Sequence, residues 1–83
     1  MPARKQSPRK EPPADPFAAL YPNIASWVQD GWVEIGRDDY SRSLVRALDI
    51  GGVIWEGETS YPSLHDALKA LDVGIAEWLE ENG

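Results

Sequence analysis

The sequence of 83 residues contains no cysteine, one histidine and only eight lysines and arginines. Without cysteine the chain has no disulfide framework, no thiolate nucleophile and no thiolate-ligated zinc site. No apolar run approaches the roughly 20 residues that a bilayer span needs. The basic N-terminus has no apolar segment behind it, so we expect no secretory signal and a cytoplasmic location.

Basic charge is scarce and unevenly placed. Fourteen acids against eight bases give a formal net charge of −6. Residues 1–16 hold four bases, two acids and five of the seven prolines, whereas residues 17–83 hold four bases and twelve acids. This division predicts a disordered basic, proline-rich tail over 1–16 and a single acidic domain over 17–83. The acidic domain disfavours nucleic acid as the main partner, because such binding depends on bases that neutralise phosphates.

The domain is rich in aromatic residues, with four tryptophans, and the first of the four lies in the first predicted helix. Pro22 suits the first turn of a helix, where its missing N–H costs nothing. Ile24, Trp27 and Val28 then share one face at helical spacing, and Gly31 follows as a stop. The pattern predicts a helix over 22–30.

The last segment predicts a longer helix over 64–81. Ser63 and Asp66 have the spacing of a capping box, with Asp in place of the usual Glu. The apolar face would consist of Leu64, Ala67, Leu68, Leu71, Ile75, Trp78 and Leu79, and the polar face of His65, Lys69, Asp72, Glu77 and Glu80. Gly74 is unfavourable inside a helix, which predicts a close approach to the sheet or to the first helix.

Three short strands are predicted between the helices, at 32–35, 44–48 and 53–56. The connections are short, and Gly51-Gly52 suits a tight turn. We therefore expect an α+β fold of order α-β-β-β-α, a three-stranded antiparallel meander with two helices packed on one face. The expected core comprises Ile24, Trp27, Val28, Val33, Ile35, Val45, Ala47, Val53, Trp55, Leu68, Leu71, Ile75 and Trp78.

Side chains alternate along a strand, so the register decides which residues face away from the helices. The register that we favour sets Arg46 between Glu34 and Glu56, an arrangement that cross-strand pairing of opposite charges stabilises. It turns seven residues outward, namely Trp32, Glu34, Leu44, Arg46, Leu48, Ile54 and Glu56. An apolar patch rimmed by charge predicts an interaction surface with Trp32 as its anchor and Arg46 as an oriented charge. In the alternative, Trp32 folds over the sheet edge, or the tail or the 36–43 loop covers the patch.

Catalytic and cofactor motifs are sparse. His65 as a base for Ser41, Ser43 or Ser63 would need an orienting carboxylate, for which Asp66 or Asp38 could serve, but no serine lies in a nucleophile motif. Adjacent Asp38 and Asp39 lack the further oxygen ligands that a metal loop supplies. Gly51-Gly52 lacks the lysine of a phosphate loop. We expect no enzyme, no cofactor and no metal.

The order helix–strand–strand–strand–helix resembles the double-stranded-RNA-binding domain. That family binds RNA through a basic cluster at the start of its last helix, where this sequence reads SLHDALKALD, with one lysine and two acids. The resemblance therefore implies the topology without the binding residues.

A second resemblance, over about residues 53–81, is to the partner-binding domain of HicB-like antitoxins, which has a three-stranded meander followed by a helix. It rests on Gly57, Ser63-Leu64, Asp66-Ala67-Leu68 and the run Ile75–Leu79. This sequence departs from that pattern in its added N-terminal helix, and no DNA-binding segment follows the last helix. It also resembles short uncharacterised bacterial proteins of the type W-x-E-I-G…V-R-A-L-D…G-G…W-E-G, a likeness that implies no function.

Two functions from different classes follow. The first is a small non-catalytic bacterial protein-interaction module that either forms a homodimer or binds a basic protein partner. The second is a nucleic-acid-associated protein that uses the basic tail or the region of Arg37, Arg42 and Arg46. Salt-sensitive retention of RNA would favour the second, and a defined dimer or a co-purifying basic protein the first.

Overall fold

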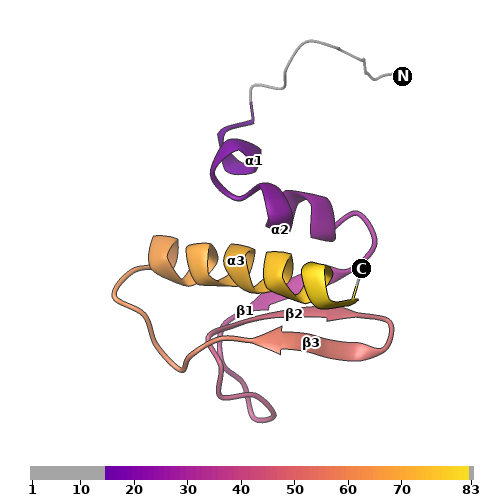
Figure 1. The fold of residues 1–83 in the computed structure, drawn as a ribbon. Helices are drawn as coiled ribbons and strands as arrows, with labels where there is room; N and C mark the ends of the chain where they lie inside the picture. The colour runs from indigo at the N-terminus through magenta and orange to yellow at the C-terminus, as the bar shows by residue number, and fades with distance from the viewer. Residues whose placement is uncertain (1–14, 83) are drawn as a thin grey trace, which may run out of the picture.

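The computed structural model describes residues 15–82 and confirms the α+β class and the order α-β-β-β-α (Figure 1). Its elements are α1 (Pro16–Leu20), α2 (Pro22–Trp27), β1 (Trp32–Ile35), β2 (Val45–Asp49), β3 (Gly52–Glu56) and α3 (Leu64–Asn82). The tail predicted over 1–16 lies outside the described residues except for its last two, which begin α1. Asp15 is the N-cap of that helix, and its carboxylate accepts a hydrogen bond from the N–H of Phe17.

The helix predicted over 22–30 is α2, and a further short helix, α1, precedes it. The chain breaks at Tyr21, because Pro22 offers no N–H and restricts the backbone of the residue before it. α2 then ends at Trp27, three residues earlier than predicted. Val28 is the C-cap beyond its end and is exposed, so its assignment to the core was wrong.

The sheet is an antiparallel meander in the order β1-β2-β3. Its register pairs Arg46 with Glu34 on one side and Glu56 on the other, as the charges predicted. A bulge interrupts β3: Ala47 pairs with Trp55 but Leu48 pairs with Val53, which leaves Ile54 as the extra residue. The bulge reverses the alternation beyond it. Val53 is therefore exposed on the outer face and Ile54 packs against the core, the opposite of the prediction for both residues.

All helices lie on the same side of the sheet (Figure 1). α3 packs on β2 and β3, while α2 packs mainly on α3. The edge strand β1 is thus poorly covered, and Ile35 near its end is exposed rather than part of the core.

The core joins the two short helices, the central strand and the long helix. Its buried apolar members are Tyr21, Ile24, Val45, Ala47, Ala67, Leu71 and Ile75. Ser63 caps α3 by accepting a hydrogen bond from the N–H of Asp66, as predicted. The predicted close approach at Gly74 is to the sheet, because a Cβ atom at this position would overlap the indole of Trp55.

Asp72 lies in the core, which corrects its assignment to the polar face of the last helix. It is 6 % exposed. Its carboxylate accepts hydrogen bonds from the backbone N–H groups of Asn23 and Ile24, at 2.8 and 2.9 Å, and from the side-chain amide of Asn23. These are donors at the start of α2 that have no partner within that helix. A buried carboxylate of α3 therefore caps α2 and fixes it in place.

Candidate interaction surface

The sheet face opposite α3 carries an apolar row that crosses all three strands. Trp32 of β1 pairs with Leu48 of β2, and Leu48 pairs with Val53 of β3. Trp32 is 45 % and Val53 47 % exposed, and Leu48 between them is half-buried. We call these three residues the apolar row. It lies at the end of the sheet that carries the β2–β3 turn, where Ile50 is fully exposed.

Arg46 lies on the same face, yet it is only 4 % exposed. Its guanidinium donates to the carboxylate of Glu34 at 2.9 Å, to the carbonyl and hydroxyl oxygens of Ser43 and to the carbonyl oxygen of Gly36 at 2.8 Å. Two of these partners belong to the segment between β1 and β2. The predicted role of Arg46 as an exposed, oriented charge is therefore corrected: it fastens this loop to the sheet.

The 36–43 loop, which we call the covering loop, thus covers part of the face. This was one of the alternatives considered from the sequence. The predicted surface divides accordingly. Leu44 and Ile54 pack against the core, Arg46 is buried beneath the loop, and Trp32, Glu34, Leu48 and Glu56 retain exposed surface.

Trp32 is held in a defined position. Its indole N–H donates to Oε2 of Glu34 at 3.3 Å, while Oε1 of the same carboxylate accepts from Arg46 at 2.9 Å. A buried guanidinium therefore orients the carboxylate, which in turn orients the exposed indole. An aromatic side chain that is ordered before binding loses little conformational freedom when a partner covers it.

Asp38 shapes the loop that covers Arg46. Its Oδ1 accepts hydrogen bonds from the backbone N–H groups of Tyr40, at 2.8 Å, and Ser41, at 2.7 Å. These two hydrogen bonds lower the pKa of Asp38 from its ordinary value of 3.8, and the positive charge of Arg46 acts in the same direction.

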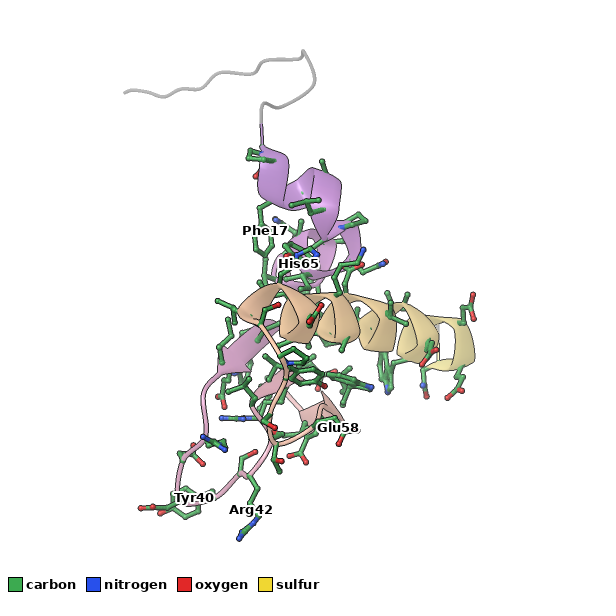
Figure 2. All side chains as sticks on the ribbon, turned by 90° about the vertical axis from the view of Figure 1, so that its left-hand side faces the viewer. Phe17, Tyr40, Arg42, Glu58 and His65 are labelled. Atoms are coloured by element: carbon green, nitrogen blue, oxygen red, sulfur yellow. The ribbon has the colours of Figure 1, made fainter. Side chains whose placement is uncertain are left out.

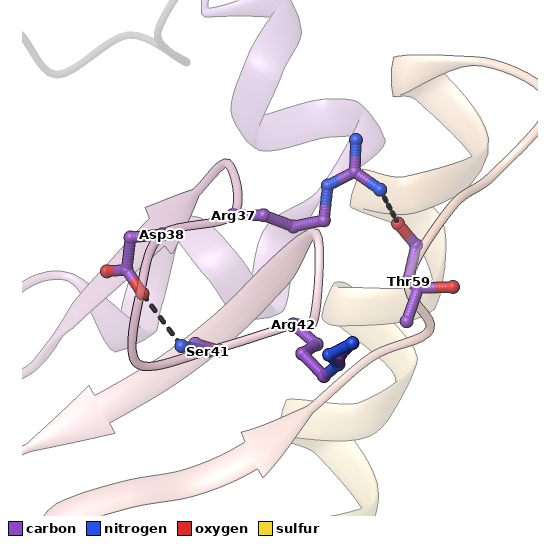
Figure 3. A pocket seen from close by; sticks show the side chains of 5 residues that line it. All are labelled: Arg37, Asp38, Ser41, Arg42 and Thr59. Carbon is purple, nitrogen blue, oxygen red and sulfur yellow. Dashed lines mark hydrogen bonds between the residues drawn. The ribbon is translucent and has the colours of Figure 1, made fainter.

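A hollow of about 360 Å³ lies beside this loop and is lined by Arg37, Asp38, Ser41, Arg42 and Thr59 (Figure 3). Arg37 donates to the carbonyl oxygen of Thr59 at 3.2 Å. The two arginines are two of only four bases in residues 17–83, but Asp38 offsets part of their charge. Arg46, the third member of the predicted basic region, does not line this hollow and is buried instead.

A second hollow, of about 280 Å³, lies at the other end of the fold, where the end of α2, the C-terminal part of α3 and the β2–β3 turn meet (Figure 1). We call it the tryptophan hollow. Its lining residues are Ser26, Trp27, Asp30, Gly31, Asp49, Trp78 and Leu79. Sequence reasoning assigned both tryptophans to the core and missed the two aspartates, because Asp30 lies in the turn after α2 and Asp49 at the end of β2.

The structure gives His65 a structural partner. Its Nδ1 lies 2.6 Å from the hydroxyl of Tyr21, and it projects near Phe17, far from Tyr40 and Arg42 in the covering loop (Figure 2). Within residues 15–82 no group of three or more histidines and carboxylates is placed to hold a metal ion. No helix in this range is long and apolar enough to cross a membrane.

Comparison of the chain with protein-family models, with curated proteins and with solved structures finds no match.

Proposed function

We propose that this protein is a non-catalytic interaction module that binds a basic segment of a partner protein on the open face of its sheet. The observation that carries the proposal is the exposed indole of Trp32, held in position by Glu34 and Arg46 at one end of an apolar row. Tryptophan is enriched among the residues that dominate binding energy at protein interfaces.

The charge of the domain favours a basic partner. Residues 17–83 carry twelve acids against four bases, and Glu34 and Glu56 lie beside the apolar row on the same face of the sheet. A symmetric homodimer through this face would set the acidic surface of one copy against the same acidic surface of the other, and the two would repel each other. A lysine- or arginine-bearing segment has the complementary charge.

The resemblance to the partner-binding domain of HicB-like antitoxins supports the same class of function, because it implies a protein partner. Nucleic-acid association through Arg37 and Arg42 remains the second candidate, and the hollow that these two residues line favours it. Arg46 does not add to that surface because it is buried.

Binding of two designed peptides tests the proposal. One alternates lysine with valine and the other glutamate with valine, and binding is followed by NMR on the ¹⁵N-labelled full chain. We expect the lysine peptide alone to bind and to shift the indole N–H signal of Trp32 and the amide signals of Leu48 and Val53. Trp32→Ala should weaken binding by about tenfold or more and leave the unfolding midpoint nearly unchanged.

Tyr40→Ala is the matched control, because it removes an exposed aromatic ring at the tip of the covering loop (Figure 2). Equal affinity of wild type and Trp32→Ala would overturn the proposal. So would a dimer, seen by light scattering, that Trp32→Ala dissociates. Salt-sensitive binding of an RNA oligonucleotide that is lost in an Arg37→Ala/Arg42→Ala variant would favour the second candidate.

A further inference from the structure

We infer that the tryptophan hollow is a recognition site for one cationic side chain, an arginine or lysine of the partner. The inference deepens the proposed function and rests on it for the partner's basic character. It places a second contact at a different position from the apolar row, on the helix side of the same end of the sheet.

The walls of the hollow are rigid. The indoles of Trp27 and Trp78 meet edge to face, with ring centroids 5.6 Å apart. The Trp27 N–H donates to the carbonyl oxygens of Leu48, at 3.0 Å, and Trp32, at 3.2 Å, which fixes the ring to the ends of β1 and β2. Gly31 leaves room for this contact, because a Cβ atom at that position would lie 2.7 Å from Nε1 of Trp27.

The chemistry of the lining suits a cation. Tryptophan has the aromatic ring that attracts cations best, and Asp30 and Asp49 add two carboxylates. Asp49 uses Oδ1 to accept from the N–H of Gly51, which leaves Oδ2 for a ligand. Asp30 is exposed and lines the hollow, so its carboxylate is open to a ligand as well.

The surroundings add to the negative potential. α3 is 19 residues long, ends beside the hollow and has no basic residue in its last turn. The C-terminal end of a helix carries partial negative charge that a cation stabilises. Glu77, Glu80 and Glu81 lie in the same part of α3.

The size of the hollow limits the ligand. At about 280 Å³ it lies below the roughly 300–1,000 Å³ of pockets that hold drug-sized molecules. One side chain fits such a space better than a nucleotide or an extended cofactor. Aromatic and acidic walls together favour a guanidinium or ammonium group on a flexible aliphatic chain.

The test uses acetyl-arginine amide and acetyl-citrulline amide as probes of the full chain. Citrulline has nearly the shape of arginine without its charge. We expect the arginine probe to shift the indole N–H signals of Trp27 and Trp78 and the citrulline probe to leave them in place. Asp30→Asn and Asp49→Asn should each weaken arginine binding by about two- to fivefold, and the asparagine at position 49 can still accept from Gly51.

Asp39→Asn is the matched control, because it changes the net charge equally on the exposed 36–43 loop at the other end of the fold. Equal binding of the two probes would overturn the inference, because it would show that the site recognises shape and not charge. An effect of Asp39→Asn as large as that of Asp30→Asn or Asp49→Asn would also overturn it, because it would show that binding depends on overall charge alone. Trp32→Ala separates the two proposals. It should leave the arginine probe's affinity unchanged while weakening the lysine–valine peptide, and the opposite result would place the cation site on the open face.

Discussion

At the scale of single residues, two buried charged side chains, Arg46 and Asp72, hold neighbouring segments of the chain in place. Each is nearly inaccessible, and each meets partners that lie far away along the chain or in a loop. Arg46 holds the covering loop and, through Glu34, the exposed Trp32. Asp72 holds the start of α2. Buried charges of this kind persist because hydrogen bonds replace the lost solvation.

Asp72→Ala tests the second of these roles. The buried N–H of Ile24 would lose its partner, and an unsatisfied buried donor costs about 1–3 kcal/mol. We expect urea unfolding to show a loss of stability in this range. Glu77→Ala, an exposed change on the same helix, should stay within about 0.5 kcal/mol. A similarly small effect for Asp72→Ala would show that α2 does not depend on this carboxylate.

Acid titration tests the role of Asp38. A lowered pKa means that the ionised carboxylate stabilises the folded loop. This stabilisation is complete above the ordinary value of 3.8 and is lost as the pH falls through the lowered pKa. The amide signals of Tyr40 and Ser41 should therefore titrate with a midpoint below 3.8. In Asp38→Asn they should not titrate, and a wild-type midpoint at or above 3.8 would contradict the expectation.

The long helix and the strands, at the scale of elements, follow from local periodicity. The face of α3 that carries Leu71 and Ile75 could be predicted because apolar residues recur at helical spacing. The inward positions of Val45 and Ala47 followed from strand alternation and from the charges of Glu34 and Arg46. These patterns lie within a few residues of one another and need no knowledge of the rest of the chain.

Other features depend on contacts that no local pattern encodes. The bulge at Ile54 exchanged the positions of two apolar residues, Val53 and Ile54, that are equivalent by composition. Asp72 lies beside Leu71 and four residues after Leu68, at the border of the apolar face, and this position was the one available signal of its burial. The tryptophan hollow joins residues from three separate segments, so its aspartates could not be grouped from the sequence.

Gly74→Ala tests the contact between α3 and the sheet. Alanine favours the helix by about 1 kcal/mol, but its methyl group would overlap the Trp55 indole, and overpacking costs about 1–3 kcal/mol. We expect a net loss of up to about 2 kcal/mol in chemical unfolding. Trp55→Leu in the same chain should recover part of the cost as a favourable coupling between the two sites. A Gly74→Ala variant more stable than the wild type would show that the indole moves aside freely.

At the scale of the whole molecule, the two hollows lie at different ends and have different linings, one with two arginines and one with two tryptophans and two aspartates. The arginine-lined hollow lies toward the 36–43 loop, and the tryptophan hollow lies at the end where α3 finishes (Figure 1). The apolar row lies at the same end as the tryptophan hollow, because the Trp27 indole N–H donates hydrogen bonds to the carbonyl oxygens of both Trp32 and Leu48. A partner that reaches around this end of the sheet would contact the apolar row and the tryptophan hollow together.

Deletion of residues 1–14 tests the domain boundary. The cut retains Asp15, which caps α1, and we expect the melting temperature to stay nearly unchanged because the deleted segment offers little apolar surface to bury. A fall of several degrees would show that this basic segment stabilises the acidic domain. A gain in affinity for the arginine probe after the deletion would identify the segment as a competitor for the tryptophan hollow.

The cap on α2 also determines when this helix can reach its final structure during synthesis of the chain. A six-residue helix is too short to persist alone in water, and the carboxylate that completes it lies 48 residues further along the chain. At roughly 5–20 residues per second, the ribosome needs about 2–10 s to cover that distance. The part of the domain made first is thus among the last to acquire its final structure, and until then the apolar side chains of Ile24 and Trp27 stay open to chaperones.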